Sequence, residues 1–351
     1  MTKGRTTLAQ VAKAAGVSVS TASLAFSGTG SITADTRDKV LKCAQELGYS
    51  GPNPLGRQLR SGRSGIVSVI LGTNPGRAFS EPVAVQQLDG LVSALGEAGL
   101  GVLLIPGLAG DPLVGTAVMD AAVLLWGMIP EDPNLVTLAR RGIPLVVDEG
   151  PPMPGAALVG IRDEDGMQEI AQYLLDLGHT RIAEVALPFH QRGEHCGFAD
   201  ATRFALADRP ATAHRLAGLR KAVEPLATWE THISSVDEGK KAGAAFLDLP
   251  ENQRPTAIVC HSDLLAAGVV LALRERGLKP GVDVSVTGFD GLSLPWLGPD
   301  VLTTMHQPLR EKGLLLGQAV LNLLAGGEPT ETYLPVELVV GTTTGPVPTS
   351  T

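Results

Sequence analysis

The sequence predicts an α/β protein in which a small all-α head, with a helix-turn-helix pattern, is joined by a hinge to a larger two-lobed domain with parallel sheets. Three observations support this prediction. Residues 1–65 hold nine cations and three acids, a net charge of +6, so the remaining residues carry −14 and bring the 351-residue chain to −8. Short capped helical patterns fill the head. From Ile66 onward, short apolar runs alternate with helical stretches.

The composition is that of a globular protein of two or three domains, since 44% of the residues are hydrophobic. No apolar run reaches the roughly 18 residues of a membrane span, and no apolar signal core opens the chain. Cys43, Cys196 and Cys260 are far apart and odd in number, so they form neither a disulfide framework nor a metal-ligand spacing. We therefore expect a cytoplasmic protein with no membrane contact, no cofactor and no metal.

The head begins with two helices around a glycine turn. Thr7 is expected to cap a helix over residues 8–15, and Gly16 then supplies a turn that needs no Cβ. Ser18 caps a second helix, which ends near Phe26, and a third helix follows over about 34–47. Helix, glycine turn and capped helix form a helix-turn-helix pattern, although a three-helix fragment is also a common structural unit.

In the helix-turn-helix geometry, the second helix lies in the major groove and its N-terminal residues meet base edges. Hydroxyl groups at a helix N-terminus suit phosphate oxygens. The net positive charge of the head favours this interpretation over a purely structural one. The candidate DNA-binding residues of the head are Thr7, Ser18, Val19, Ser20, Thr21, Ser23, Leu24 and Ser27.

The run LAQVAKAAGVSVSTAS, residues 8–23, resembles the head of the lactose-repressor (LacI/GalR) family of bacterial transcription regulators. The similarity continues through Thr36-Arg37-Asp38-Lys39-Val40, Leu47-Gly48-Tyr49 and Pro52-Asn53, and it reaches residues 59–64. One departure is that Leu24 and Val19 are apolar where many relatives carry a polar base reader. Leu24 can contact a thymine methyl group but cannot hydrogen-bond to guanine, so the operator sequence stays open.

The resemblance also implies a role for the segment that follows the head. In this family, a leucine from each subunit is wedged into the minor groove at the operator centre and kinks the DNA, which assigns that role to Leu59. Arg57 and Arg60 would flank the wedge. The alternative is a flexible linker, which Gly56 favours because glycine weakens a helix by about 1 kcal/mol relative to alanine. Both hold if the segment is disordered when free and helical on DNA.

The body of the chain has the pattern of parallel sheets, because short buried runs alternate with helices. Ligands of such sheets bind outside the carboxyl ends of the strands. The predicted helices lie at about 83–98, 166–177 and 263–276. The predicted strands lie at 66–71, 101–105, 121–125, 144–147, 181–185, 256–260 and 285–287, with a possible closing strand at 334–340.

The body resembles the periplasmic-binding-protein-like effector domain of the same family. Its marks are Asp165-Gly166, Leu177-Gly178-His179-Thr180-Arg181-Ile182-Ala183, Ser262-Asp263 and Val284-Ser285-Val286-Thr287-Gly288-Phe289-Asp290. The implied domains are a DNA-binding head at 1–49, a hinge at 50–65 and an effector-binding and dimerisation domain at 66–351. Within that domain we expect an N-lobe at about 66–162 and 295–327 and a C-lobe at about 163–294 and 328–351.

Residues at the ends of the predicted strands are the candidate effector contacts. Asp290 and Asp148 each follow a strand, and we favour ligand contact over a turn or capping role for both. Ser262 and Asp263 also follow a strand, but for Asp263 we favour a helix cap. Phe79 could stack on a ligand, although a single loop phenylalanine more often serves packing.

The resemblance gives Glu194 a special place, because relatives commonly carry an effector-gripping arginine there. A carboxylate at this position cannot bind an anion and would repel a nearby Asp290. Arg192 could substitute from another direction. We therefore expect a neutral polyol, a sugar or a cationic ligand rather than a carboxylate or phosphate, and an empty cleft is a further alternative.

No catalytic motif is present, and His190, His195 and Cys196 are too few to indicate a metal site. The run from Arg162 to Asp165 is expected to be a solvated helix start. We therefore expect not an enzyme but a DNA-binding transcription regulator. It is expected to be a repressor that binds a palindromic operator as a homodimer and is controlled allosterically by a sugar or other neutral polar metabolite. The alternatives are a solute-binding receptor or non-catalytic sensor, an α/β enzyme, and an architectural DNA-binding protein.

Overall fold

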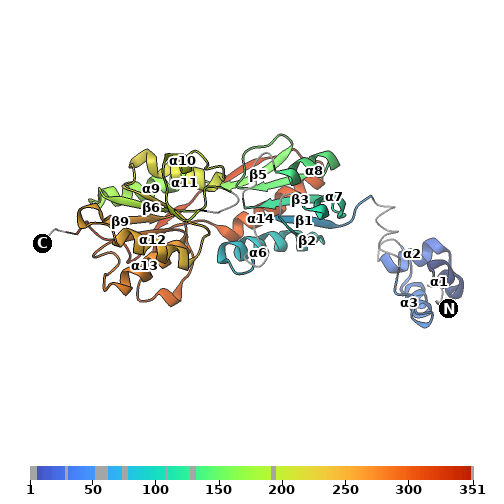
Figure 1. Ribbon diagram of the computed structural model, residues 1–351. Coiled ribbons are helices and arrows are strands. Elements are labelled where there is room, and N and C mark those ends of the chain that lie inside the picture. The colour runs from blue at the N-terminus through green and yellow to red at the C-terminus, as the bar shows by residue number, and fades with distance from the viewer. Residues whose placement is uncertain are drawn as a thin grey trace, which may run out of the picture. The chain divides into compact units, whose positions relative to one another are not determined.

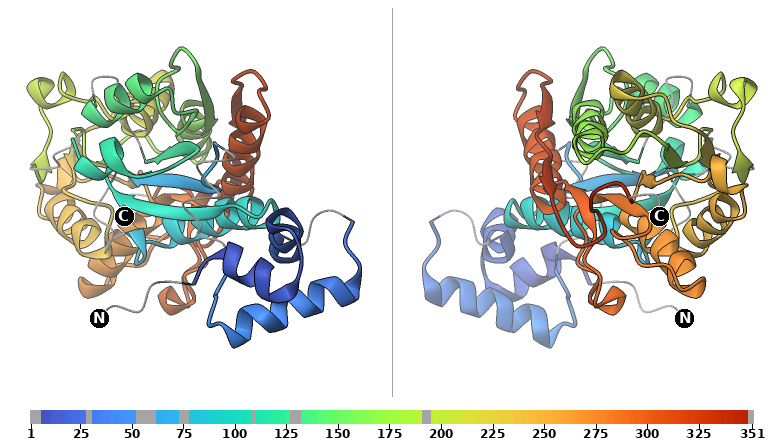
Figure 2. Two further views of the ribbon diagram at one scale, coloured as in Figure 1. Left: turned by 90° about the vertical axis from the view of Figure 1, so that its right-hand side faces the viewer. Right: turned by 90° about the vertical axis from the view of Figure 1, so that its left-hand side faces the viewer.

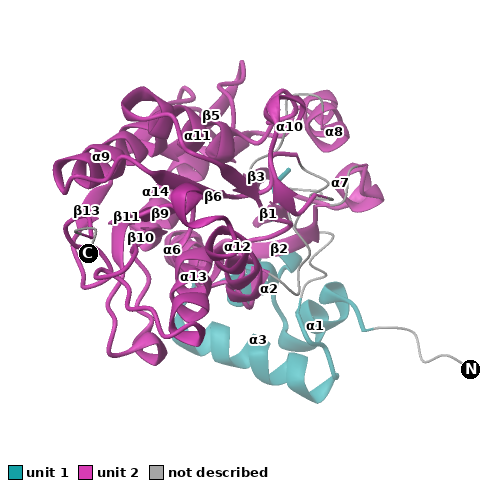
Figure 3. Cartoon of the chain, turned by 60° about the vertical axis from the view of Figure 1, so that its left-hand side comes forward, with its two compact units in different colours: residues 1–64 teal, residues 65–351 magenta. Residues whose placement is uncertain are grey.

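The computed structural model describes residues 6–27, 31–51, 62–72, 78–107, 110–126, 132–190 and 195–348. The chain divides into two compact units, residues 1–64 and residues 65–351 (Figures 1 and 3). Of the described helices, none is long and apolar enough to cross a membrane.

The first unit contains, within its described part, the helices α1 (Leu8–Ala15), α2 (Val19–Ser27) and α3 (Ala34–Glu46). Thr7 caps α1 in a reciprocal capping box with Gln10, and Gly16 ends it at φ 65°. Small side chains let the helices approach closely. The buried core of this unit is Val11, Ala12, Ala15, Ala22, Ala25, Val40 and Ala44.

The second unit contains two α/β lobes. In the N-lobe, the described strands form a six-stranded sheet in the order β12-β5-β4-β3-β1-β2, and every described pairing in it is parallel. The elements of this lobe are β1 (Ile66–Leu71), α6 (Pro82–Glu97), β2 (Gly101–Pro106), α7 (Pro112–Thr116), β3 (Ala121–Leu125), α8 (Pro133–Arg141), β4 (Leu145–Asp148), β5 (Ala156–Ile161), α14 (Leu309–Leu324) and β12 (Glu331–Leu334).

In the C-lobe, the described strands form a seven-stranded sheet in the order β13-β11-β10-β9-β6-β8-β7, whose outer strands β13 and β7 are antiparallel to their neighbours. Its elements are α9 (Asp163–Asp176), β6 (Ile182–Ala186), β7 (Gly197–Phe198), α10 (Ala201–Phe204), α11 (Pro210–Ala222), β8 (Thr228–Glu230), α12 (Val236–Leu247), β9 (Ala257–Cys260), α13 (Asp263–Glu275), β10 (Ser285–Asp290), β11 (Thr303–His306) and β13 (Glu337–Val339), with short 3-10 turns at Glu251–Gln253 and Pro295–Leu297.

Helices cover both faces of each sheet, so every residue of the central strands β3, β4, β6, β9 and β10 is buried (Figures 1 and 2). In the C-lobe, α12 and α13 lie on one face and α9 and α11 on the other. The predicted α/β class with parallel sheets is confirmed. The strands predicted at 66–71 and 121–125 coincide with β1 and β3, and the other predicted strands agree to within a few residues.

The sheet pairings place the lobe crossings differently from the sequence-based boundaries. The first crossing is at Arg162, as expected, but β11 pairs with β10, so residues 295–306 belong to the C-lobe. The second crossing is therefore at 307–308 rather than near 294. The strand β12 pairs with β5 in the N-lobe, which moves the third crossing from about 328 to 335–336.

The closing strand expected at 334–340 is also wrong as a single element. The chain forms β12 in the N-lobe sheet and then β13 in the C-lobe sheet, with two residues between them. A continuous apolar run does not reveal that its halves pair in different lobes, because the pairing depends on contacts far away in the sequence.

Candidate functional site

The exposed side of α2 is the candidate DNA-reading face of the head. Ala22 and Ala25 point into the helical core, whereas Val19 is 50% exposed at the first turn. Leu24 is partly buried and Ser20 is exposed. The structure thus separates a packed side from an accessible side, as the helical spacing predicted.

Hydroxyl groups gather at the N-terminus of this helix. Ser18 Oγ accepts a hydrogen bond from the backbone N–H of Thr21 at 3.0 Å, so Ser18 caps the helix. The same Oγ lies 2.7 Å from Ser20 Oγ and 2.8 Å from Thr21 Oγ1. The cluster presents hydroxyl groups at a helix N-terminus, an arrangement suited to a phosphate.

The remaining head candidates differ in position. Thr7 is exposed at the start of α1, where its side chain is engaged in the capping box. Ser23 is partly buried on α2, and Ser27 Oγ donates to the carbonyl of Leu24 at 3.2 Å. The hinge candidates Arg57, Leu59 and Arg60 lie outside the described residues.

In the body, backbone strain marks the carboxyl ends of three strands. Among the described non-glycine residues, positive φ angles occur at Trp126 (66°), Glu149 (51°) and Asp290 (130°). These residues end or directly follow β3, β4 and β10. Residues other than glycine rarely adopt such φ angles. These conformations persist where surrounding contacts hold the residue, often at binding sites. The strain therefore falls on the edges at which parallel sheets bind ligands.

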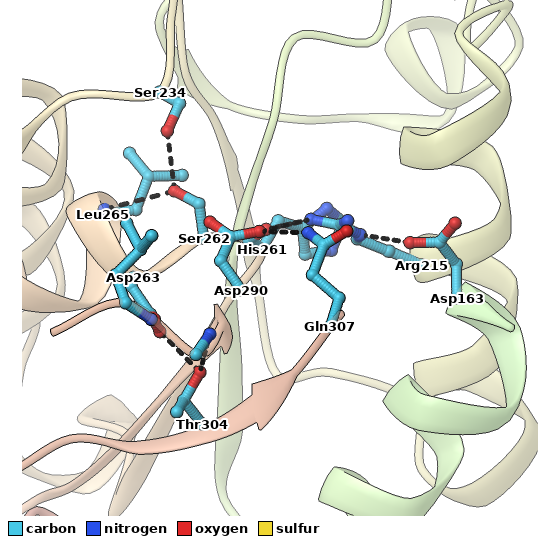
Figure 4. Close-up of polar contacts among 12 residues, drawn as sticks. Asp163, Arg215, Ser234, His261, Ser262, Asp263, Leu265, Asp290, Thr304 and Gln307 are labelled. Atoms are coloured by element: carbon cyan, nitrogen blue, oxygen red, sulfur yellow. Dashed lines mark hydrogen bonds and ion pairs between the residues drawn. The ribbon is translucent and has the colours of Figure 1, made fainter. Parts of the chain in front are cut away.

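Asp290 is held at the centre of a buried polar cluster. Its Oδ1 accepts a hydrogen bond from Gln307 Nε2 at 2.7 Å and lies 4.0 Å from Arg215 Nη1. Figure 4 shows the Arg215 and Gln307 side chains converging on this carboxyl group. Burial raises the pKa of Asp290 well above its usual value, against the lowering effect of Arg215.

Arg215 is a functional candidate that the sequence reasoning missed. It lies on α11 and is 3% exposed. Its Nε donates to Asp163 Oδ1 at 2.6 Å, its Nη1 donates to the carbonyl of His261, and its guanidinium lies 3.8 Å from the centre of the Phe289 ring. Asp163 is therefore buried in an ion pair. The sequence analysis had expected it to be solvated at a helix start, and that expectation is wrong.

No local pattern in the sequence singles out Arg215, because its partners Asp163, His261 and Asp290 lie far away along the chain. Gly218 is required where α11 crosses α9, because a Cβ there would lie 2.3 Å from the backbone oxygen of Glu164. The arginine beside Asp290 therefore comes from residue 215, whereas Glu194 and Arg192 lie outside the described residues. The argument against an anionic effector cannot rest on Glu194 alone.

Asp148 lies on the matching edge of the N-lobe and is completely buried. Its Oδ2 accepts a hydrogen bond from the backbone N–H of Trp126 at 3.3 Å, and its Oδ1 lies 3.4 Å from Lys312 Nζ. The pKa of Asp148 is raised to about 6 by burial, which outweighs the lowering effect of Lys312. The structure pairs Asp148 with a lysine that the sequence analysis did not single out.

The pair that follows β9 has separate roles. Ser262, and not Asp263, caps α13: its Oγ accepts from the N–H of Leu265 at 3.3 Å and lies 2.8 Å from Ser234 Oγ. The Asp263 carboxylate accepts from Thr304 Oγ1 and from the N–H of Leu292, both at 2.6 Å. It therefore ties α13 to the segments around β10 and β11 (Figure 4).

The loop candidates fare differently. Phe79 is 60% exposed, so it does not serve the packing role that was the alternative for it. The charge of Glu81 also raises the pKa of Asp290. His190 Nδ1 bonds to Asp208, and among the described residues no group of three metal-ligating side chains comes together.

Comparison with known proteins gives matches over both units. A family model described as bacterial regulatory proteins of the lacI family matches residues 7–53, and one for a periplasmic binding protein-like domain matches residues 171–344. An HTH-type transcriptional regulator of Mycolicibacterium smegmatis is 32% identical over 97% of both chains. One from Mycobacterium tuberculosis is 33% identical over 97% of this chain and 98% of its own.

Solved structures agree with this result. The lac repressor dimer bound to operator and an anti-inducer aligns with a TM-score of 0.78 and 26% identity, over 97% of this chain and 99% of that one. A complex of the transcriptional regulator CelR with cellobiose aligns with a TM-score of 0.67 and 25% identity, over 97% of this chain and all of that one.

Proposed function

We propose, starting from the fact that this chain belongs to the lacI family of bacterial regulatory proteins, that a small molecule bound between its two α/β lobes controls how tightly it holds DNA. The chain is a DNA-binding transcription regulator and not an enzyme. The observation that carries the proposal is the buried polar cluster at the strained carboxyl ends of β4 and β10, because a ligand there contacts both lobes at their crossings.

On DNA, the protein acts as a homodimer in the cytoplasm and represses transcription from a palindromic operator. The first turn of α2 enters the major groove, with Val19 and Ser20 at the base edges and the Ser18 hydroxyl at a phosphate. Leu59 of each hinge wedges into the minor groove between Arg57 and Arg60. The lac repressor, solved as a dimer bound to operator, supports a dimer on DNA.

The effector is a sugar or another neutral polar metabolite. Two buried cations, Arg215 and Lys312, face five carboxyl groups, of which four are buried and that of Glu149 is partly buried, so an anionic ligand adds to an existing excess of acid. Ionised carboxylates accept hydrogen bonds from ligand hydroxyl groups. The cellobiose complex of CelR supports a sugar. The five carboxyl groups belong to Asp148, Glu149, Asp163, Asp263 and Asp290.

A direct test combines ligand screening with DNA binding. Sugars and polar metabolites are screened by thermal shift, and each hit is titrated against the affinity of the full-length protein for genomic fragments. An allosteric coupling of about 1–3 kcal/mol changes that affinity some 5- to 150-fold. Failure to prefer any genomic fragment over random duplex at modest ionic strength, with or without metabolites, contradicts the proposal.

The effector site is tested separately with Asp290→Asn, which keeps the shape of the side chain and removes its charge. We expect this variant to lose the response to the ligand while its DNA affinity stays within about twofold of the wild type, since the head is a separate unit. Loss of DNA binding and ligand response together would show that Asp290 is needed for folding instead.

A further inference from the structure

A buried lysine, Lys312 on α14, lies next to the second crossing, where the chain passes from the C-lobe to the N-lobe. It is 1% exposed. Its Nζ lies 3.4 Å from Asp148 Oδ1, bonds to the Glu149 carboxylate and lies 3.5 Å from Gln307 Oε1. An ammonium group removed from water needs such partners, because an unpaired buried charge is very costly. Its partners come from the end of β4 and from the second lobe crossing.

Through Gln307 this contact continues into the C-lobe. Gln307 donates to Asp290 at 2.7 Å, Asp290 lies 4.0 Å from Arg215, and Arg215 bonds to Asp163 at 2.6 Å. The two candidate effector carboxyl groups, one in each lobe, are thus joined by Lys312 and Gln307.

In the other direction the contacts reach α6. Asp148 accepts the backbone N–H of Trp126, and the Trp126 indole N–H donates to Gln87 Oε1 on α6 at 2.8 Å. The helix α6 also packs directly on α14, where a Cβ at Gly313 would lie 2.1 Å from the backbone oxygen of Gln87. Lys312 therefore sits at a junction of α14, the end of β4 and the second crossing.

We propose that Lys312 is a positioning residue of the effector site, which holds Asp148 as an oriented carboxylate and links it through Gln307 to Asp290 in the other lobe. The inference rests on the proposed function, since it assigns Asp148 to the effector site. The groups that face Asp148 are Lys312, Glu149, Gln87 and the Trp126 N–H. The charge of Asp163 also raises the pKa of Lys312.

The charge state of Asp148 decides what it can bind. An ionised carboxylate only accepts hydrogen bonds, whereas a protonated one also donates, so the two states select different ligands. Burial favours the protonated form, and Lys312 is the largest opposing influence on the pKa of Asp148. Without the ammonium group, Asp148 titrates at higher pH and loses its tie to α14.

The experiment follows this titration and needs neither ligand nor DNA. The chain has three tryptophans, so Trp229→Phe/Trp296→Phe leaves Trp126 as the only emitter, in contact with Asp148. In this background we expect the Trp126 emission to change with a midpoint near pH 6, and Asp148→Asn to abolish the change. A transition that survives Asp148→Asn overturns the proposal.

The decisive variant is Lys312→Met, which keeps an unbranched side chain one atom shorter and removes its charge. We expect the midpoint to rise by at least one pH unit, whereas Lys312→Arg stays within about half a unit of the parent. The matched control is Lys240→Met, which removes an exposed partner of Glu275 and leaves the midpoint unchanged. An unchanged midpoint in Lys312→Met, or equal shifts for Met and Arg, overturns the proposal.

If Lys312→Met does not fold, Lys312→Met/Glu149→Gln removes a matched pair of charges and retains Asp148. Its midpoint is expected between those of the parent and Lys312→Met, because Glu149 raises the pKa of Asp148 while Lys312 lowers it more. A midpoint equal to the parent's overturns the role of Lys312. Because no effector enters this titration, its failure is distinct from a failure of the operator-binding test.

Discussion

Asp290 is held in a backbone conformation that carboxylate residues rarely adopt, and its contacts explain why it stays there. Its φ angle is 130°. Gln307 donates to its side chain, and Arg215 lies close by. Strain of this kind costs on the order of 1–3 kcal/mol and persists only where the surroundings fix the residue. The strain points the carboxyl group at the place where the chain crosses between lobes.

Asp263 shows how burial separates a structural acid from a ligand-binding one. Both oxygens of its carboxylate are used within the C-lobe, by Thr304 and by the N–H of Leu292. Gly288 lies against it so closely that a Cβ would be 2.1 Å from Asp263 Oδ1. These contacts engage both carboxylate oxygens within the C-lobe and favour a structural role.

Asp263→Asn is expected to change the pH dependence of stability. The pKa of Asp263 in the folded protein is raised from 3.8 to about 6, chiefly by burial. Its contribution to the free energy of unfolding is therefore fully present below about pH 4 and is lost as the pH rises through about 6. The asparagine variant lacks this titration, so the wild-type advantage over it shrinks from pH 4 to pH 7.

Urea unfolding of both proteins at several pH values measures this difference. Comparing two proteins cancels the titration of shared groups, among them His179 and His261, whose lowered pKa values act in the opposite direction. A difference between the two proteins that is constant across this range would contradict the expected titration of Asp263.

At the scale of elements, α6 and α14 pack closely against each other and against the N-lobe sheet. Glycines on both helices allow backbone-to-backbone contact: a Cβ at Gly90 would lie 2.0 Å from the oxygen of Arg310, and one at Gly313 would lie 2.1 Å from that of Gln87. An ion pair of 2.7 Å between Arg310 and Asp89 flanks the contact. Since α14 follows the second crossing directly, these contacts connect that crossing to α6.

Gly313→Ala is expected to destabilise the protein by about 1–3 kcal/mol, because the added methyl group meets backbone that has no room to move. The matched control is Gly96→Ala near the end of α6, where no atom lies within 4 Å of the new Cβ. That change should stabilise by about 0.5–1 kcal/mol, since alanine is the better helix former. Denaturant unfolding measures both, and equal effects would rule out the close packing of the helices.

At the scale of the whole molecule, the head and the body differ in the sign of their net charge. The head and hinge carry +6 and the body −14, so the body repels DNA while the head attracts it. We therefore expect non-specific DNA contact to be confined to the N-terminal 65 residues.

Arg57→Ala and Arg60→Ala are each expected to weaken binding to all DNA sequences and to flatten its salt dependence. Each lost phosphate contact lowers the slope of log K against log salt by about 0.9, or about 1.8 for a dimer. Fluorescence anisotropy over a range of salt concentrations measures the slope. Arg276→Ala, which removes an ion pair in the body, serves as the control. Slopes identical to that of the wild type would contradict the hinge assignment.

Local pattern was enough for the class of fold and for part of the secondary structure. The capping by Thr7 and Ser18, the glycine turn and the buried strands depend on neighbours a few residues away, and α1, β1 and β3 begin and end where predicted. The carboxyl ends of strands also located Asp148 and Asp290. Elements with weaker local patterns, such as α11, α12 and α14, were not predicted.

The sequence by itself determined that a basic helical head precedes an acidic α/β body, since charge and periodicity are local properties of the chain. Only the tertiary structure decided where the chain crosses between the lobes and which cations lie beside the buried carboxyl groups. Arg215 is 75 residues from Asp290 along the chain, and Lys312 is 164 residues from Asp148. Such pairs form because burial leaves no water to solvate a charge, and folding alone brings the partners together.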